Sequence, residues 1–443
     1  MTSQQRIRLA LALTAASAFS LALLSPAAEA RTQDSRPECP RTLDCEWVPA
    51  AYQQTGDPAD KETYGSYDTA DRPRTGKIKY IVLHDTEETF DRTLQIFQDP
   101  HNQTSAHYVV RSADGHVAQM VKDKDVAWQA GNWYINQQSI GIEQEGVATE
   151  GAKWFTPAMY RSTAQLVRYL AAKYDIPLDR QHIIGHDNVP PTSAAGAAAM
   201  HWDPGTFWDW DYFMSLVGGP TVPTAGSTSQ LVTVSPVFKQ NIQSFRDCEK
   251  NIDLPAQPSS AVPLYTEPST KAPLFSDPGL HTDGSAGTNC IADWGSKISA
   301  SQQAVVAERK PGWTAIWWYG QKAWFRSPEH TRTTTPTGGY VVRPKAGRTD
   351  VPVYGVAYPE KSEYPADFTA AHLGTPLQYT IKQGQAYPGG GEAPTGYYYA
   401  PTIDSSYPYD HTYFPGGTKY VTVQIGHRVA FVKASDVDIV RTH

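Results

Sequence analysis

The sequence predicts an α/β domain followed by an all-β region, and three observations support this fold class. From Lys77 to about Val217, β-branched runs alternate with a helical pattern, as in a central mixed sheet flanked by helices. A stretch rich in Gly, Pro, Thr and Ser at 218–229 has too little apolar content to pack, which predicts a linker. Beyond it, short alternating strands are separated by Pro and Gly. We therefore expect the α/β domain at 77–217.

Apolar runs locate the first strands of this domain. The run 78–83 is β-branched and ends at His84, so this histidine lies where a strand opens into a loop. Folds of the α/β class often place functional groups at such points. The runs 106–110 and 116–120 are separated by Ala113-Asp114-Gly115, whose D-G signal predicts a hairpin turn.

A further strand is expected at 139–143, and a helix with marked ends follows it. Thr156 can cap the helix, and Pro157 fits its first position. Apolar residues recur at helical spacing as far as Leu170. Ile176-Pro177 ends the helix, because proline cannot continue it.

The region after the linker contains a loose internal repeat. The segments V-P-L-Y at 262–265 and V-P-V-Y at 351–354 lie roughly ninety residues apart, and each leads to a closing hairpin. An opening segment and a closing hairpin that recur in this way are typical of a duplicated small β-barrel. We therefore expect two β modules, at 230–335 and 336–443.

The N-terminus has the pattern of an export signal. Arg6 and Arg8 precede an apolar run at 9–24, and Ala28-Glu29-Ala30 has the A-x-A form of a cleavage site. We expect 1–30 to be a signal peptide, followed by an N-terminal extension at 31–76. No later segment approaches the apolar length of a membrane span. The sequence thus predicts a secreted protein, extracellular or cell-wall associated, with no membrane contact after cleavage.

The four cysteines are expected to form disulfides. An even number of cysteines in an exported chain favours disulfides over free thiols. The natural pairing is local, Cys39 with Cys45 and Cys248 with Cys290. A zinc knuckle is the alternative, but the long gap between the two pairs and the lack of a C-x-x-C motif argue against it.

The composition argues against one class of partner. The formal net charge is −7, and Lys and Arg are scattered, so the sequence has no basic stripe for a nucleic acid. The chain contains 25 Tyr and 12 Trp, and aromatic faces are what sugar rings stack against. All-β modules are also rich in both residues, so this remains a hint.

Residues suited to a zinc site follow the predicted strands. Two neutral imidazoles and one carboxylate, with a fourth position open to water, form a common catalytic zinc site. His84, His186 and Asp203 fit that description. A carboxylate must then accept the proton of the water, and Glu143 is the candidate general base, in competition with Glu145.

These residues resemble the N-acetylmuramoyl-L-alanine amidase type 2 family, which includes peptidoglycan recognition proteins and T7 lysozyme-like zinc amidases. The resemblance covers roughly 77–217, where five elements occur in family order: I-V-L-H-D-T, S-A-H-Y-V-V, S-I-G-I-E-Q-E-G, G-H-D and H-W-D-P-G. It implies that His84, His186 and Asp203 hold Zn²⁺ and that Glu143 acts on the water. It also implies that His201, two positions before Asp203, stabilises the oxyanion.

The sequence departs from the family at two points. Relatives often have Lys where this chain has His201, and an imidazole of ordinary pKa, about 6.5, is protonated only below neutrality. We therefore expect activity to fall as His201 loses its proton, and His201→Lys to broaden the pH profile. The second departure is an Ala/Gly-rich insert at 193–199, which could form a helical turn or a mobile loop.

Further residues are candidates for substrate contact, each with a structural alternative. His107 is either core packing or a contact to a ligand or substrate, whereas Trp128, Asn132 and Trp133 either line a substrate groove or pack. The C-terminal half resembles bacterial SH3-like modules, and the motifs V-P-V-Y, G-W-T-A-I and R-V-A-F-V-K carry this resemblance. That resemblance implies that the modules bind the wall and raise the local substrate concentration, as tethered modules do. A structural appendage is the alternative.

The resemblance implies secreted zinc-dependent hydrolysis of the amide between N-acetylmuramic acid and L-alanine in peptidoglycan, whose glycan strand and stem peptide would be the partners. The alternative is a recognition protein that binds peptidoglycan without cutting it. A non-catalytic relative would be expected to lack a metal ligand where Asp203 stands, so its presence favours the enzyme. A vestigial domain in a structural or adhesive protein fits the intact set of five elements less well.

Overall fold

The computed structural model describes residues 36–58, 63–220, 223–331 and 333–442. The predicted signal peptide at 1–30 lies outside these residues. Pro37–His443 forms one compact unit. No helix in the described ranges combines the length and apolar character needed to cross a membrane.

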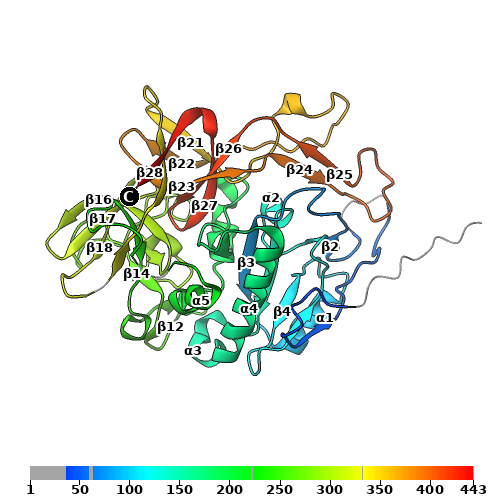
Figure 1. The fold of residues 1–443 in the computed structure, drawn as a ribbon, viewed down its shortest axis with the longest axis horizontal. Coiled ribbons are helices and arrows are strands. Elements are labelled where there is room, and N and C mark those ends of the chain that lie inside the picture. Colours follow the sequence, from blue (N-terminus) through cyan, green and yellow to red (C-terminus); the bar gives the residue numbers. More distant parts are fainter. Residues whose placement is uncertain (1–35, 59–62, 221–222, 332, 443) are drawn as a thin grey trace, which may run out of the picture. The chain divides into compact units, whose positions relative to one another are not determined.

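A six-stranded mixed sheet forms the centre of the predicted α/β domain (Figure 1). Its central strands run parallel, and the predicted hairpin adds an antiparallel pair. The strand order is β1 (Cys45–Trp47), β5 (Val117–Gln119), β4 (Tyr108–Val110), β7 (Ser139–Gln144), β3 (Tyr80–Asp85) and β8 (Ile183–Gly185). The strand at 78–83 and the strand at 139–143 are thus confirmed within one or two residues.

Helices cover one face of the sheet. These are α4 (Pro157–Tyr174) and α5 (Trp210–Val217), which pack on alternate residues of β3 such as Ile81 and Leu83. The predicted start of α4 is confirmed, because Thr156 Oγ1 accepts a hydrogen bond from the backbone N of Met159. Shorter helices are α1 (Phe90–Phe97), α2 (Trp133–Asn136) and α3 (Gly151–Trp154).

The opposite face of the sheet is covered partly by the C-terminal region. Tyr80 and Val82 of β3 belong to one apolar cluster with Phe431, Tyr358 and Tyr397. Because side chains alternate along a strand, the continuous apolar run of β3 reflects burial on both faces. The expected tethered modules are therefore not observed, since the C-terminal region is part of the packing of the α/β domain.

The described part of the extension, 36–58 and 63–76, also belongs to this domain. Strand β1 pairs with β5 at the edge of the central sheet, and β2 (Tyr67–Asp68) pairs with β6 (Val126–Ala127). The disulfide between Cys39 and Cys45 lies at the start of β1, as the sequence predicts.

Two larger antiparallel sheets form the β-rich region. The first has the order β18 (Gln321–Arg326), β17 (Trp313–Trp318), β16 (Gln303–Lys310), β9 (Leu231–Val234) and β19 (Thr334–Pro336). The second has the order β22 (Pro376–Lys382), β21 (Asp350–Tyr354), β27 (Arg428–Lys433), β26 (Tyr420–Ile425), β23 (Tyr387–Ala393), β20 (Gly339–Pro344) and β28 (Val437–Thr442). One apolar core extends through both, so the two modules are packed together.

Short two-stranded pairings complete this region. They are β10 (Ile242–Gln243) with β13 (Gln257–Pro258), β11 (Arg246–Asp247) with β12 (Ile252–Asp253), β14 (Ala261–Pro263) with β15 (Lys297–Ser299), and β24 (Gly396–Tyr399) with β25 (Thr412–Pro415). The last pair forms an arm that extends over α2 (Figure 1).

The internal repeat has a structural counterpart. In the first module the tyrosine of V-P-L-Y, Tyr265, pairs with Trp324 in the closing hairpin. In the second, the tyrosine of V-P-V-Y, Tyr354, pairs with Phe431 at the equivalent hairpin position. Opening segment and hairpin thus contact each other in the same way in both modules. An SH3-like fold for these modules remains a prediction.

Candidate metal centre

Strand ends bring His84 and His186 together. His84 is near the end of β3, and His186 directly follows β8, in a 3₁₀ turn at His186–Asn188. These two strands are parallel neighbours, with Leu83 paired to Gly185. The next residue of each chain segment is therefore a histidine at the same edge of the sheet.

Asp203 completes a compact triangle of possible ligands. His84 Nδ1 lies 3.1 Å from His186 Nδ1 and 3.1 Å from Asp203 Oδ2, and His186 Nδ1 lies 3.1 Å from Asp203 Oδ1. Donor atoms on a tetrahedral zinc ion with bonds of about 2.0–2.1 Å stand about 3.3 Å apart. The spacing and chemistry of these three groups therefore fit a zinc ion, with one coordination position left for water.

Gln129 sets the orientation of the His84 ring. Its Oε1 lies 2.6 Å from His84 Nε2, and its Nε2 donates to Ser139 Oγ at 2.8 Å. Because the amide oxygen can only accept, Nε2 of His84 carries the proton in this bond, and the Nδ1 lone pair remains available to a metal. Gln129 was not among the sequence-predicted site residues. The one feature of the sequence that could have indicated a role for Gln129 is its position directly after Trp128, a predicted substrate contact.

Charge and burial oppose each other at these ligands. Burial alone would lower the pKa of His84, but the Glu143 and Asp203 carboxylates raise it to about 9. Burial also lowers the pKa of His186. The pKa of Asp203 is held far below its ordinary value by His186 and His84, although burial opposes this shift. Neighbouring groups whose pKa values depend on one another in this way are typical of a functional site.

Glu143, rather than Glu145, faces the candidate ligands. Strands β3 and β7 pair His84 with Glu143 in register, and Glu143 lines the same cavity as the three ligands. Burial raises the pKa of Glu143 to about 8, and a nearby cation would lower it again. Glu145 instead accepts backbone hydrogen bonds from Phe90 N at 3.0 Å and Ser112 N at 2.7 Å.

His201 lies at the rim of the cavity. Its side chain is 72% exposed, and Nδ1 lies 3.8 Å from Asp203 Oδ1. The ring stacks on His186, with centroids 4.8 Å apart. This position is beside the ligands and open to an incoming substrate. The insert at 193–199 forms a 3₁₀ turn, Ala194–Ala199, whose end also lines the cavity.

The cavity has a volume of about 720 Å³, and the first β module forms part of its wall. The Cys248–Cys290 disulfide, predicted from the sequence, lies in this wall. The wall residues of the module are Asp247, Cys248, Glu249, Lys250, Ile291 and Ala292. Apart from the disulfide itself, these residues could not be predicted as part of the site, nor could Asp85 and Glu87, because no local pattern indicates which distant segments meet.

The four residues predicted to contact substrate do not line the metal cavity. Three of them, Trp128, Asn132 and Trp133, are close together in the sequence. Asn132 is buried, and it caps α2 and donates to the backbone oxygens of Pro190 and Gly355. Trp128 and Trp133 line a second cavity. The structure therefore assigns Asn132 to the framework and does not bring any of these three side chains to the metal ligands.

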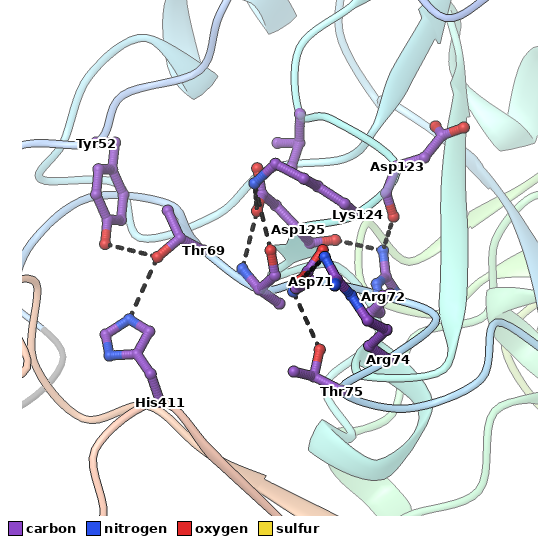
Figure 2. Close-up of polar contacts among 12 residues, drawn as sticks. Tyr52, Thr69, Asp71, Arg72, Arg74, Thr75, Asp123, Lys124, Asp125 and His411 are labelled. Atoms are coloured by element: carbon purple, nitrogen blue, oxygen red, sulfur yellow. Dashed lines mark hydrogen bonds and ion pairs between the residues drawn. The ribbon is translucent and has the colours of Figure 1, made fainter. Parts of the chain in front are cut away.

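His107 is part of a buried polar network. Its Nδ1 accepts from Gly141 N at 3.1 Å, and its Nε2 lies 2.9 Å from Nη2 of Arg72. Arg72 in turn donates to the backbone oxygens of Asp123 and Asp125 (Figure 2). The His107 side chain is completely buried. It holds the extension against the sheet and does not reach the cavity.

Comparison with known proteins gives matches to this region of the chain. The profile of the N-acetylmuramoyl-L-alanine amidase family matches residues 74–206. The chain is also similar to N-acetylmuramoyl-L-alanine amidase A of Achromobacter lyticus, with 27% identity over 164 residues, covering 35% of this chain and 89% of that protein.

Solved structures give similar matches. The endolysin N-acetylmuramoyl-L-alanine amidase LysCS of Clostridium intestinale is 16% identical, covering 42% of this chain and 99% of that one, with a TM-score of 0.28. The Staphylococcus aureus hydrolase AmiA, solved with its ligand, is 15% identical, covering 41% of this chain and 82% of that one, with a TM-score of 0.29. The matching profile thus covers the same part of the chain as the ordered motifs, and over residues 74–206 the chain is similar to the N-acetylmuramoyl-L-alanine amidase family.

Proposed function

We propose that the protein is a secreted, zinc-dependent amidase that hydrolyses the bond between N-acetylmuramic acid and L-alanine in peptidoglycan. The observation that carries the proposal is the convergence of His84, His186 and Asp203 at 3.1 Å, with Glu143 in register on the neighbouring strand. The family match and the name of the Achromobacter lyticus relative support the choice of bond.

The residues of the chain divide the chemical work between them. A bound zinc ion would act as a Lewis acid and lower the pKa of a bound water towards about 7. Glu143 would accept the proton of that water and pass it to the leaving amine. Gln129 keeps the His84 ring in place through its hydrogen bond. His201, at the rim, would stabilise the negative oxygen of the tetrahedral intermediate when it carries its proton.

Secretion is the second part of the proposal. The signal pattern at 1–30 supports export, and the two disulfides fit an oxidising compartment. The test is the N-terminal sequence of protein recovered from the culture medium of an expressing bacterium. A mature end near Arg31 would support export, whereas intact protein retained in the cytoplasm would refute it.

The activity is tested on purified peptidoglycan with and without a chelator. We expect new alanine amino termini together with free lactyl carboxylates, and we expect chelation to abolish both. Glu143→Gln should remove the activity while metal content, measured by elemental analysis, stays the same. Glu267→Gln, at an exposed position of the first β module, is the matched control. New reducing sugar ends would indicate a glycosidase, and binding without any new ends would indicate a recognition protein.

A further inference from the structure

A second cavity lies between the amidase domain and the second β module. Its volume is about 300 Å³. The amidase domain supplies Trp128, Trp133 and Asn136, and the second module supplies His372 and the tyrosines at 397–399. Among the residues that the structure describes, no Lys or Arg lines this cavity, and Asp68 supplies the one carboxylate. A charged ligand would therefore find few partners here.

The walls of this second cavity are fixed by hydrogen bonds across the two parts of the chain. Tyr398 N donates to Gln137 Oε1 at 2.7 Å, and Gln137 Nε2 donates to Gly396 O at 2.9 Å. Tyr398 also donates its hydroxyl to Thr69 O at 2.7 Å. A further contact, between Thr69 Oγ1 and His411, joins the same segments (Figure 2). The cavity is thus preformed, which lowers the entropy cost of binding.

The two tryptophans offer carbon surface to the cavity. Trp128 Nε1 donates to Asp68 Oδ2 at 2.7 Å, and Trp133 Nε1 donates to Tyr398 O at 2.8 Å. Both indole N–H groups are therefore occupied by protein atoms. What remains for a ligand is the aromatic ring, the kind of surface on which sugar rings stack.

Asn136 adds a hydrogen-bond donor. Its side-chain oxygen accepts from Ala130 N at 2.8 Å and from Gln129 N at 3.4 Å. Backbone N–H groups can only donate, so the amide must present Nδ2 on its other side. Asn136 is 7% exposed and lines the cavity, and within the described ranges its Nδ2 has no partner. A donor that lines a cavity without a protein partner can donate to a bound ligand.

The second cavity adjoins the metal cavity. Gln103 and Trp128 line the second cavity, whereas the next residues, Thr104 and Gln129, line the metal cavity. The two segments are joined by Thr104 Oγ1, which donates to Trp128 O at 3.3 Å. Gln129 itself contacts the ligand His84. The two cavities are therefore lined by consecutive residues of the same two segments.

We propose that the second cavity binds an N-acetylated sugar ring of the glycan strand, next to the muramic acid at the metal centre. Trp128 and Trp133 supply the stacking surface, and Asn136 Nδ2 donates to an acetamido or hydroxyl oxygen. With one carboxylate, that of Asp68, and no Lys or Arg among the described lining residues, the cavity favours a sugar over the charged stem peptide. The identity of the strand rests on the proposed function, whereas saccharide binding at this cavity does not.

The test is isothermal titration of the full mature protein with the tetramer of N-acetylglucosamine, in the presence of a chelator. Binding under these conditions is independent of amidase activity, so the failure of one proposal is distinguishable from the failure of the other. Asn136→Asp keeps the oxygen that accepts from Gln129 and Ala130 but removes the donor. We expect it to weaken binding about fivefold to tenfold, the effect of one lost hydrogen bond.

Two further variants separate binding from folding. His372→Ala removes an exposed ring of the lining that stacks on Tyr397, with centroids 4.8 Å apart, so it should weaken binding; the titration is run well below the melting temperature of each variant. Asn251→Asp is the matched control, because it keeps the side-chain oxygen that accepts from Arg246 on the first β module. Failure of the tetramer to bind, equal binding by all variants, or binding of a stem tripeptide in its place would each overturn the proposal.

Discussion

Gln129 Oε1 accepts a hydrogen bond from Nε2 of His84 at 2.6 Å, on the side of the ring away from His186 and Asp203. This bond determines which ring nitrogen of His84 is available as a ligand. Partners of this kind are as much part of a metal site as the ligands, since they hold the ring in its tautomer and orientation.

Gln129→Leu should therefore weaken zinc affinity by about 10–100-fold. The residual metal-loaded protein should retain activity, because Glu143 and the ligands are unchanged. Competition with a chromogenic chelator measures the affinity, and Gln165→Leu serves as the control, because this half-buried side chain of α4 also donates a hydrogen bond, to Thr42, but lies away from the cavity. An affinity equal to that of the wild type would show that His84 does not depend on Gln129.

Glu145 and Glu143 should respond in opposite ways to substitution. Both oxygens of Glu145 accept from backbone N–H groups, at Phe90 and Ser112, so Glu145→Ala leaves two donors without their partner. We expect a loss of about 1–3 kcal/mol in the free energy of unfolding, with kcat retained in the folded fraction. Urea unfolding measures the first quantity and assays below the transition measure the second. Loss of kcat in folded protein would assign the general base to Glu145.

The local features of the α/β domain could be predicted from the sequence because each depends on neighbouring residues. The cap at Thr156, the hairpin turn at 113–115 and the histidine at the end of β3 are of this kind. The ligands followed from motifs in family order. The sequence did not show which of Glu143 and Glu145 faces the ligands, since this depends on which backbone donors approach each carboxylate.

The contribution of the β-rich region could not be predicted in this way. The apolar run of β3 indicates burial on both faces, but it does not identify Tyr358 and Phe431 as the cover of one face. Likewise, nothing near Lys250 or Ile291 in the sequence indicates that they line the metal cavity. Such contacts depend on long-range packing, for which a short pattern has no signature.

His201 should affect the rate more than binding. Its side chain is 72% exposed, so substitution should not disturb folding. We expect His201→Ala to lower kcat by about 10²–10³-fold with little change in KM, because an oxyanion contact forms only in the transition state. His201→Lys should retain most of the activity, since it restores a positive charge. Equal kcat values for the wild type and the Ala variant would remove His201 from the mechanism.

Lys297 should make stability depend on pH. Burial lowers the pKa of its ammonium to about 7, although Asp293 opposes the shift. The Lys297 charge, after burial and Arg428, also helps to lower the pKa of the buried His427. The unfolded chain, with an ordinary lysine pKa of about 10.4, then binds more protons than the folded one between about pH 7 and pH 10. Stability from this group is therefore lowest below pH 7 and rises with pH across that window.

Lys297→Met should remove this rise. Denaturant unfolding at pH 7 and pH 9, without reductant, measures the difference for the wild type and the variant. Lys310→Met, at an exposed position of β16, is the matched control and should keep the pH dependence of the wild type. A wild-type stability that falls from pH 7 to pH 9 by the same amount as in Lys297→Met would contradict the assignment.

The disulfide between Cys248 and Cys290 should matter for substrate binding as well as stability. It closes a loop with a sequence separation of 42 and lies in the wall of the metal cavity. Removing it with Cys248→Ser and Cys290→Ser should cost about 2–5 kcal/mol and loosen that wall. Because the candidate metal ligands lie on the α/β domain, we expect KM to rise several-fold while zinc content and kcat change less.

The other disulfide provides the comparison that separates these two effects. Cys39 and Cys45 have a sequence separation of only 6, and neither lines the metal cavity. The pair of variants Cys39→Ser and Cys45→Ser should therefore lower stability without raising KM, because the strand that it anchors pairs at the far edge of the sheet. If both double variants raised KM equally, the effect would come from general loosening of the fold, and the first β module would have no specific role in holding the substrate.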